Sequence, residues 1–406
     1  MTRPIIGRVA PEPRRTIGAS ALAQAGLTAG AVAGPGTARI AVDLLGGDHA
    51  PAVVVDGALR ACQADPALHL LLVGPLEAAG ELLAALDPAD HHRVRTLAAP
   101  AERADLARAA PPAEREAARR RENEAARRGE NSGRETNAAR DGAAARESGG
   151  SGGRGGAAVG RRPDRHAESW VESGVRTAVL AVAQGQADAV VSAGSTGATV
   201  TSAALGLGRW PGVRRPALAA VLPTAAGRLV LLDVGSSVDP DEQTLAMHAR
   251  LGAAYASVVH EIEGPRVGLL TIGTERGKGD KLRRSAPAVL AAQRLPAGAR
   301  FVGLIEGNDV VLGAAADVVV TDGFTGNVLL KGLETAYALI GPPPRTVTPP
   351  PRAAILLGVS GTVVVCHGAA DAQDLAAGIA LAAHLHRHAA VAAIAGLISQ
   401  NEVSHE

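Results

Sequence analysis

The sequence is short of cysteine, of aromatic residues and of long apolar runs. Its 406 residues include only Cys62 and Cys366, so we expect no disulfide framework, and both thiols are interpreted as small buried hydrophobic groups. No apolar run is long and pure enough for a membrane span. The N-terminus lacks the apolar core of a secretion signal, which predicts a cytoplasmic protein.

Lysine is also scarce. The chain has 41 basic residues, and only Lys278, Lys281 and Lys331 are lysines, while aromatic residues make up 1%. The composition favours Arg and Ala over Lys, Phe and Asn. Residues that persist against this bias are candidates for a specific role. They include the three lysines, which we place in or beside glycine-rich loops, together with Phe324 and Asn327.

Composition also divides the chain. Residues 1–38 are rich in Ala, Gly, Pro and Arg without periodicity, which predicts a poorly ordered extension. Residues 101–165 are rich in Arg, Ala and Gly and have too few apolar residues to offset the entropy of ordering, so we predict a disordered insert. Arginine attracts nucleic acid and anionic lipid. The interspersed acids and missing aromatics favour a solvated loop, and no nucleic-acid partner is expected. Residues 39–400 are predicted to form one α/β domain around this insert.

Most of that domain repeats one pattern, in which a buried strand is followed by a loop rich in Gly, Ser, Thr, Asp or Asn and then by a helix. Strands are predicted at residues 39–43, 68–73, 94–98, 187–193, 266–272, 301–305 and 318–320, with antiparallel pairs at 216–222 with 229–232 and 355–358 with 362–365. This pattern predicts a doubly wound, mostly parallel sheet with an antiparallel excursion. Right-handed crossovers would bring the loops to one edge of the sheet, where a small anion and an extended polar ligand would bind.

The loop at residues 321–327 is the most informative of these. It lies between a strand of three valines and a helical pattern, so it offers backbone N–H groups and a helix N-terminus to an anion. We predict that Asn327 caps the helix. Lys331 would then lie in the first turn, where the helix dipole disfavours a cation unless an anion is nearby.

Several cofactor sites are not supported. No Gly-x-Gly-x-x-Gly stands between a strand and a helix, and the loop at residues 273–281 has the wrong spacing for a nucleotide-binding P-loop. His384, His386 and His388 lie on one predicted helix, but no carboxylate or cysteine completes a metal site. We therefore expect neither a metal nor a cofactor.

Six segments carry a resemblance to a known family. They are residues 40–51, 192–198, 215–218, 232–235, 265–270 and 320–328. Together they resemble the bacterial phosphate acyltransferases of the PlsX family. The resemblance implies a Rossmann-like fold related to phosphotransacetylases and isopropylmalate dehydrogenases. It also implies transfer of an acyl group from acyl-carrier protein to inorganic phosphate, which gives acyl phosphate for phospholipid synthesis.

This chemistry needs donors that hold phosphate against a thioester carbonyl and stabilise the developing oxyanion. Lys278 is the candidate for holding phosphate, and Asn327 for orienting phosphate or the carbonyl. His49 would protonate the leaving thiolate or, the favoured alternative, hold a structural hydrogen bond. The predicted substrate-binding residues are Asp43, Gly46, Gly47, Asp48, Gly194, Ser195, Thr196, Gly197, Asp233, Gly235, Lys281, Asp322, Gly323, Phe324, Thr325, Gly326 and Lys331.

Alternatives remain for several of these residues. Lys281 and Lys331 are either ligands or exposed cations. Asp233 and Asp322 are expected to brace loops through backbone N–H groups rather than to act as bases.

The chain also departs from the family pattern. Serines stand at 195, 236, 237 and 360, where the family has Asn or Ala-Asn, and a serine lacks the reach and second donor of the amide. The family has a long helical hairpin, linked to membrane association and packed near a dimer interface, where residues 335–352 here are short and proline-rich. A homodimer is the expectation, and peripheral membrane contact is open. Two other activities stay open, an acyl-CoA-dependent phosphate acyltransferase and an inactive acyl- or phosphate-binding homologue.

Overall fold

The computed structural model describes residues 36–99, 165–275, 277–341, 343 and 352–403. The predicted extension and the predicted insert lie almost wholly outside these residues, so both stay predictions. The chain divides into two units, one formed by residues 1–99 with 174–406 and the other by residues 100–173. The description below concerns the first unit.

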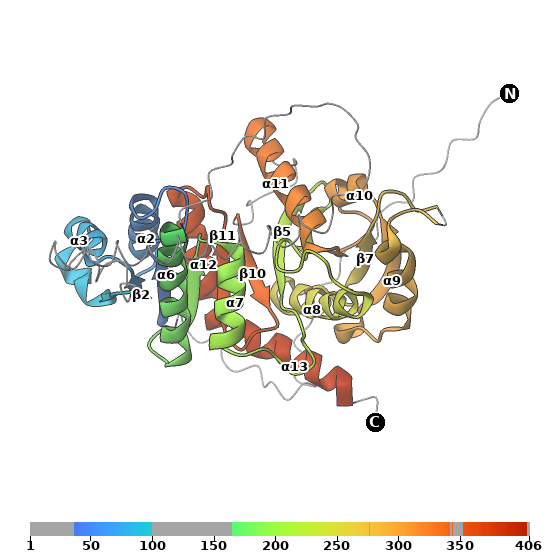
Figure 1. The fold of residues 1–406 in the computed structure, drawn as a ribbon, viewed down its shortest axis with the longest axis horizontal. Helices are drawn as coiled ribbons and strands as arrows, with labels where there is room; N and C mark the ends of the chain where they lie inside the picture. The colour runs from blue at the N-terminus through green and yellow to red at the C-terminus, as the bar shows by residue number, and fades with distance from the viewer. Residues whose placement is uncertain (1–35, 100–164, 276, 342, 344–351, 404–406) are drawn as a thin grey trace, which may run out of the picture. The chain divides into compact units, whose positions relative to one another are not determined.

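One sheet of eleven strands runs through this unit (Figure 1). Its order is β3-β2-β1-β4-β11-β10-β5-β6-β9-β7-β8. The strands are β1 (Ala38–Asp43), β2 (Leu68–Val73), β3 (Val94–Leu97), β4 (Ala189–Ser192), β5 (Ala217–Thr224), β6 (Gly227–Leu232), β7 (Arg266–Leu270), β8 (Arg300–Ile305), β9 (Val318–Val320), β10 (Ala353–Leu357) and β11 (Thr362–Cys366). The mostly parallel α/β sheet and the two antiparallel pairs are confirmed.

Helices cover both faces of the sheet, and each face has its own apolar core. One face carries α2 (Ala52–Ala64), α3 (Leu76–Ala85), α8 (Glu242–His260), α9 (Lys281–Ala292), α12 (Ala372–Arg387) and α13 (Ala390–Val403), and the other carries α6 (Arg165–Ala183), α7 (Thr196–Gly206), α10 (Gly307–Leu312) and α11 (Gly323–Ile340). Two 3₁₀ turns, η1 (Pro88–Arg93) and η2 (Pro296–Gly298), complete the elements. In Figure 1, α2 and α12 lie together near one end of the sheet, and α8 and α9 near the other. The result is a three-layer α/β/α arrangement.

The parallel strands form two groups that run in opposite directions. Strands β3, β2, β1, β4 and β11 are mutually parallel, and so are β6, β9, β7 and β8. Between them, β10 is antiparallel to both β11 and β5, and β5 is antiparallel to β6. The carboxyl ends of the two groups therefore point toward each other rather than to one common edge, which corrects the expectation drawn from the sequence.

The register nevertheless brings these two sets of ends together. Leu232, the last residue of β6, shares one row of the sheet with Ala219, Ile355 and Val364. Val364 lies only two residues before Cys366, where β11 ends. The two sets of carboxyl ends thus overlap by two rows, or roughly 7 Å along the strands. Loops from both groups consequently meet over the middle of β5 and β10.

The helices give one further finding about membranes. Within the described ranges, no single helix is long and apolar enough to cross a bilayer, although α12 and α13 pass a length and composition test as a pair bent by 57°.

Candidate active site

A cavity of about 480 Å³ lies where the two sets of loops meet, and we call it the central cavity. Its floor comes from β5 and β10, one wall from α11, and the other wall from the loops after β1, β4 and β11. It is lined by Asp48, Gly194, Thr196, Leu218, Ala220, Val221, Leu222, Pro223, Val234, Asn327, Leu330, Lys331, Glu334, Tyr337, Ala338, Arg352, Ala353, Ala354, Val365, Cys366, His367 and Gly368. Polar groups and an apolar surface therefore share one space.

The floor is apolar because of strand periodicity. Leu218, Ala220 and Leu222 alternate along β5, so their side chains lie on one face of the sheet. Ala354 pairs with Ala220 and continues this surface onto β10. All four belong to the apolar core on the α11 side of the sheet. Because two of the four are alanines, space is left above the sheet.

The loops after β1, β4 and β11 are packed backbone to backbone. A Cβ atom at Gly46 would lie 2.6 Å from the amide nitrogen of Gly194, so only glycine fits there. The amide of Asp48 donates a hydrogen bond to the carbonyl of Gly368 at 2.7 Å. Gly47 has φ near 115°, which L side chains rarely adopt. These glycines hold Asp48, Gly194 and Gly368 at the cavity wall.

Gly235 joins the two groups of strands. It follows β6 and has φ near 144°. A Cβ atom built on it would lie 3.1 Å from Nδ2 of Asn327 and 3.7 Å from Cγ2 of Thr196. The loops after β4 and β6 and the first turns of α11 therefore touch at this glycine, and the structure brings Gly194, Thr196, Gly235 and Asn327 together as a polar corner of the cavity.

Asp233 braces the loop after β6. Its carboxylate is fully buried and accepts four backbone N–H bonds, from Leu218 at 3.1 Å, Gly235 at 3.2 Å, Ser236 at 3.0 Å and Ser237 at 2.6 Å. This satisfies buried donors that would otherwise be unpaired. The prediction that Asp233 braces a loop is confirmed.

Asp43 has a similar task after β1. Its carboxylate accepts hydrogen bonds from the amide of Leu45 at 3.1 Å and the hydroxyl of Ser192 at 2.8 Å. Burial raises the pKa of Asp43 to about 6, and these hydrogen bonds offset only part of that effect. Asp43 lies behind the loop and does not line the central cavity, so its contacts are structural.

Helix α11 begins earlier than the sequence predicted. Asp322 is its N-cap and accepts a hydrogen bond from the amide of Thr325 at 2.8 Å. Asn327 is already inside the helix, so the prediction that it caps α11 is wrong. Lys331 lies beyond the first turn for the same reason, and the argument from the helix dipole does not apply to it. Both side chains nevertheless line the central cavity.

Glycine also sets how α11 sits on the sheet. Of its residues only Gly323 and Gly326 are buried. A Cβ atom at Gly326 would lie 1.9 Å from the carbonyl oxygen of Asp233, and one at Gly323 would lie 2.9 Å from the carbonyl oxygen of Ser237. The helix therefore touches the loop after β6 through its backbone, which places Asn327 beside Gly235.

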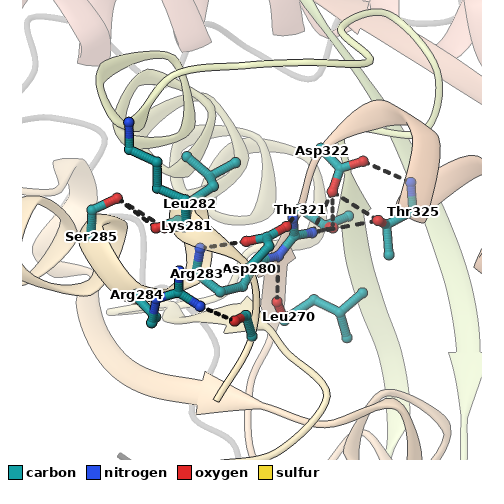
Figure 2. A network of polar contacts seen from close by, with 11 residues as sticks. Leu270, Asp280, Lys281, Leu282, Arg283, Arg284, Ser285, Thr321, Asp322 and Thr325 are labelled. Atoms are coloured by element: carbon teal, nitrogen blue, oxygen red, sulfur yellow. Dashed lines mark hydrogen bonds and ion pairs between the residues drawn. The ribbon is translucent and has the colours of Figure 1, made fainter. Parts of the chain in front are cut away.

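Arg283 is a functional candidate that the sequence did not reveal. Figure 2 shows its guanidinium, from α9, beside Asp280, Thr321, Asp322 and Thr325. It bonds to Asp280 Oδ2 at 2.8 Å, to the hydroxyl of Thr321 at 2.9 Å, and to Asp322 in a short contact. Arg283 is 8% exposed and the Asp322 side chain also 8%. It therefore ties the start of α9, just after the Lys278 loop, to the start of α11.

Phe324 and Thr325 face a different space from Asn327. They line a second cavity of about 730 Å³, together with Ile272, Arg283, Val328 and other residues of β7, α10 and α11. Helix α11 thus has a cavity on each side, and only the central cavity collects loops from both strand groups.

Several predicted residues lie away from the central cavity. His49, Ser195, Gly197, Lys278 and Lys281 are exposed and are not among its lining residues. Lys278, the candidate for holding phosphate, therefore does not share the central cavity with Asn327. Of the three lysines, only Lys331 lines the cavity. Catalytic roles for Lys278 and His49 stay predictions.

His367 lines the cavity but was not predicted as a site residue. The amide of Ala369 donates to Nδ1 of His367 at 3.1 Å. Because a backbone N–H only donates, Nδ1 accepts, and the proton of the neutral ring lies on Nε2. Burial and the nearby cations Lys331 and Arg352 lower its pKa. Its position directly after β11, like that of Asp233 after β6, is the signal that would have found it.

Cys366 also lines the cavity, but its thiol is a poor nucleophile. The residue is 3% exposed, and burial raises its pKa to about 12. The prediction that Cys62 and Cys366 are buried free thiols is confirmed. Acyl transfer through a cysteine thiolate is therefore disfavoured here.

The fold and the cavity define a class of α/β protein in which loops from two opposed groups of strands enclose a polar corner beside an apolar floor. A phosphotransacetylase from Streptococcus pyogenes has a similar fold. Its TM-score is 0.51 and its identity 19%, with 87% of this chain and 95% of that chain covered.

Comparison of sequences is more specific. A family model described as "Fatty acid synthesis protein" matches residues 38–122 and 161–342. A phosphate acyltransferase of Thermobifida fusca is 38% identical over 372 residues, covering 85% of this chain and 87% of the relative. One of Desulfitobacterium hafniense (strain DSM 10664 / DCB-2) is 34% identical over 363 residues, covering 83% and 90%. The chain belongs to the phosphate acyltransferase family, and it is an acyltransferase.

Proposed function

We propose that the chain transfers a fatty acyl group from acyl-carrier protein to inorganic phosphate, and that the acyl phosphate feeds phospholipid synthesis. Membership of the phosphate acyltransferase family supports the acceptor. The observation that carries the proposal is the central cavity, in which a polar corner for an anion opens onto an apolar floor for a hydrocarbon chain.

The reaction needs little from the protein beyond positioning and charge. An oxygen of phosphate bonds to the thioester carbonyl carbon, the carbonyl oxygen becomes an oxyanion, and the carbon–sulfur bond then breaks. The electron pair leaves with the thiolate, which takes a proton from solvent or a nearby acid. Phosphate is already an anion, so no base is required to activate it. Hydrogen-bond donors directed at the oxyanion stabilise the transition state and accelerate the reaction.

We assign these tasks to residues at the polar corner. The Nδ2 group of Asn327, beside Gly235, is placed to donate to phosphate or to the oxyanion. Lys331, which with Arg352 provides the cations of the cavity lining, is assigned to the charge of phosphate. The proton on Nε2 of His367 is a third donor. The sequence-based role of Lys278 as the phosphate-holding cation is kept as a second assignment to be tested.

The test is acyl-phosphate formation by the purified chain. Acyl-carrier protein carrying a fatty acyl group is mixed with inorganic phosphate, and the product is trapped with hydroxylamine. We expect acyl phosphate from this donor and much less from acyl-CoA. Strong preference for acyl-CoA would assign the chain to the alternative donor, and no product from either would leave an acyl- or phosphate-binding homologue.

Four variants then separate the assignments. Asn327→Ala and Lys331→Ala are expected to lower kcat/KM by about 10²-fold or more, since each removes a donor at the site of charge development. Lys278→Ala tests the sequence-based assignment, and full activity in that variant would end it. Leu205→Ala, 83% exposed and outside the cavity lining, is the control.

The remaining expectations belong to the same proposal. They are acyl-carrier protein as partner, a homodimer and a cytoplasmic location with possible contact at the membrane surface. Gel filtration and vesicle sedimentation test the dimer and the surface contact. Half of the segment where the family hairpin would stand, residues 342 and 344–351, falls outside the described residues.

A further inference from the structure

We infer that Tyr337 sets the longest acyl chain that the central cavity accepts, by closing the far end of its apolar floor. The inference rests on the proposed function, because it takes the hydrocarbon of the substrate to lie on that floor. Tyr337 would pack against the end of the acyl chain and so determine specificity, and it would take no part in the acyl transfer itself.

The cavity has a long axis that runs beside α11. Asn327, Leu330, Lys331, Glu334, Tyr337 and Ala338 line it from that helix. The spacing follows one helical face, and at 1.5 Å per residue it spans roughly 16 Å from Asn327 to Ala338. Residues 218 to 223 of β5 line the floor, and at about 3.3 Å per residue they span a similar length.

The two ends of this axis differ in chemistry. At one end Asn327 lies against Gly235 and Thr196, where the loops from both strand groups meet. At the other end the hydroxyl of Tyr337 donates a hydrogen bond to the carbonyl oxygen of Pro223 at 3.1 Å. This bond ties α11 to the carboxyl end of β5. The phenol ring therefore stands across the end of the floor.

Between these ends the surface suits a hydrocarbon. Leu218, Ala220, Leu222 and Ala354 form the floor, and Leu330 faces it from α11. Charged side chains also line the cavity, among them Lys331 and Arg352, which are exposed, and Glu334, which is partly buried. A chain bound along the floor would bury the apolar surface of the floor residues, which favours binding.

The dimensions limit the chain length. A zigzag chain advances by somewhat less than one carbon–carbon bond of about 1.5 Å per carbon, so roughly 16 Å accommodates about a dozen carbons. Longer chains would have to displace Tyr337 or bend out toward the rim. The parent protein should therefore lose activity where chains exceed this length.

Replacing Tyr337 tests the inference. We would measure kcat/KM for acyl donors from about eight to about eighteen carbons, since a pocket discriminates one methylene by roughly tenfold or more. Tyr337→Ala removes the ring and should raise the ratio of long-chain to short-chain activity at least tenfold. Tyr337→Phe keeps the ring but loses the hydrogen bond to Pro223, and its preference should stay close to that of the parent.

Leu339→Ala is the matched control. Leu339 is on the same helix, is 80% exposed and does not line the cavity, so its chain-length profile should not change. An unchanged profile in Tyr337→Ala would overturn the inference while leaving the proposed function intact. The inference would also be overturned if Leu339→Ala shifted the chain-length profile as much as Tyr337→Ala, because loosening of α11 would then explain both shifts.

A binding measurement covers the case in which no acyl phosphate forms. Free fatty acids of the same lengths are titrated into parent and Tyr337→Ala protein by calorimetry. Tighter binding of long chains only in the variant supports the length limit even if the chain is not an acyl-carrier-protein-dependent enzyme. Equal binding by both proteins refutes it.

Discussion

Removing the guanidinium of Arg283 should destabilise the protein more than any exposed arginine of α9. In Arg283→Met the side chain keeps much of its volume and loses its charge and donors. Asp322 then keeps its bonds from the amide and hydroxyl of Thr325 but loses its ion pair, and Thr321 loses a donor. The change therefore isolates the polar network shown in Figure 2.

The expected cost follows from the burial of the pair. Breaking one partner of a buried ion pair costs about 3–5 kcal/mol, because the other charge is left uncompensated. Asp322 retains two donors, which favours the lower end, so we expect a loss of about 3 kcal/mol in the free energy of unfolding. The bond to Asp280 adds little, because the Asp280 side chain is 58% exposed.

The assay is urea unfolding followed by circular dichroism. Arg284→Met is the control, since Arg284 is exposed and donates to the carbonyl of Gly279 at 2.6 Å. It should change stability by no more than about 0.5 kcal/mol. If Arg283→Met cost no more than Arg284→Met, the network would not hold α9 to α11.

The pH dependence gives an independent check. Burial raises the pKa of Asp322, but hydrogen bonds from Thr325 and Arg283 lower it by more, so the net pKa is below its ordinary value. A lowered pKa in the folded state stabilises the protein above the ordinary carboxyl pKa near 4, and this is lost as the pH falls further. Arg283→Met should lose less stability than the parent over that acidic range. Identical acid profiles would contradict the assigned pair.

Four other substitutions test the structure. Gly326→Ala should inactivate and destabilise the protein, since its Cβ would lie 1.9 Å from the carbonyl oxygen of Asp233. Gly332→Ala, on the same helix, meets nothing within 4 Å and should stabilise the protein by about 0.5–1 kcal/mol. Equal melting temperatures of the two variants would refute this. The pKa of Asp43 is raised to about 6 in the folded protein, so the protonated carboxyl favours folding and this stabilisation is lost as the pH rises from about 4 through 6. The parent should therefore lose about 3 kcal/mol in its free energy of unfolding over this range, and Asp43→Asn should not. Cys366→Ala should keep acyl-phosphate formation, and its loss would restore the thiol as a nucleophile.

The fold was largely predictable because its strands are runs of buried aliphatic residues. The three valines of β9 and the segments at β2 and β7 have no other stable interpretation between glycine-rich loops. Helix α10 was missed because only six residues form it, too few for a periodic signal. The opposed directions of the strand groups depend on pairing across β5 and β10, which no local pattern encodes.

The candidate site was only partly predictable. Glycines and aspartates after strands led to the loops at Asp48, Gly194 and Asp233, since tight turns and backbone bracing need those residue types. Two errors came from local rules. Asn327 was predicted to cap α11, but Asp322 fills that role. Lys278 was predicted at the site because of its glycine-rich surroundings, but it does not line the cavity.

Arg283 could not have been found from composition. The chain has 41 basic residues, of which three are lysines, so 38 arginines give no contrast by type. What distinguishes Arg283 is burial beside Asp322 and Thr321, contacts between α9 and the start of α11. His367 was passed over although it stands directly after β11, the same kind of position that pointed to Asp233 after β6.

The staggered meeting of the two strand groups makes the active site sensitive to strand register. A slip of one residue between β5 and β6 would move the carboxyl end of β6 by about 3.3 Å relative to β11 and would reverse which side chains of one strand face α11. The polar corner and the apolar floor would be lost together. Insertions and deletions should therefore be tolerated in the turns and outer strands of this enzyme. They should not be tolerated within β5 or β10, because these strands set the register between the two groups of parallel strands.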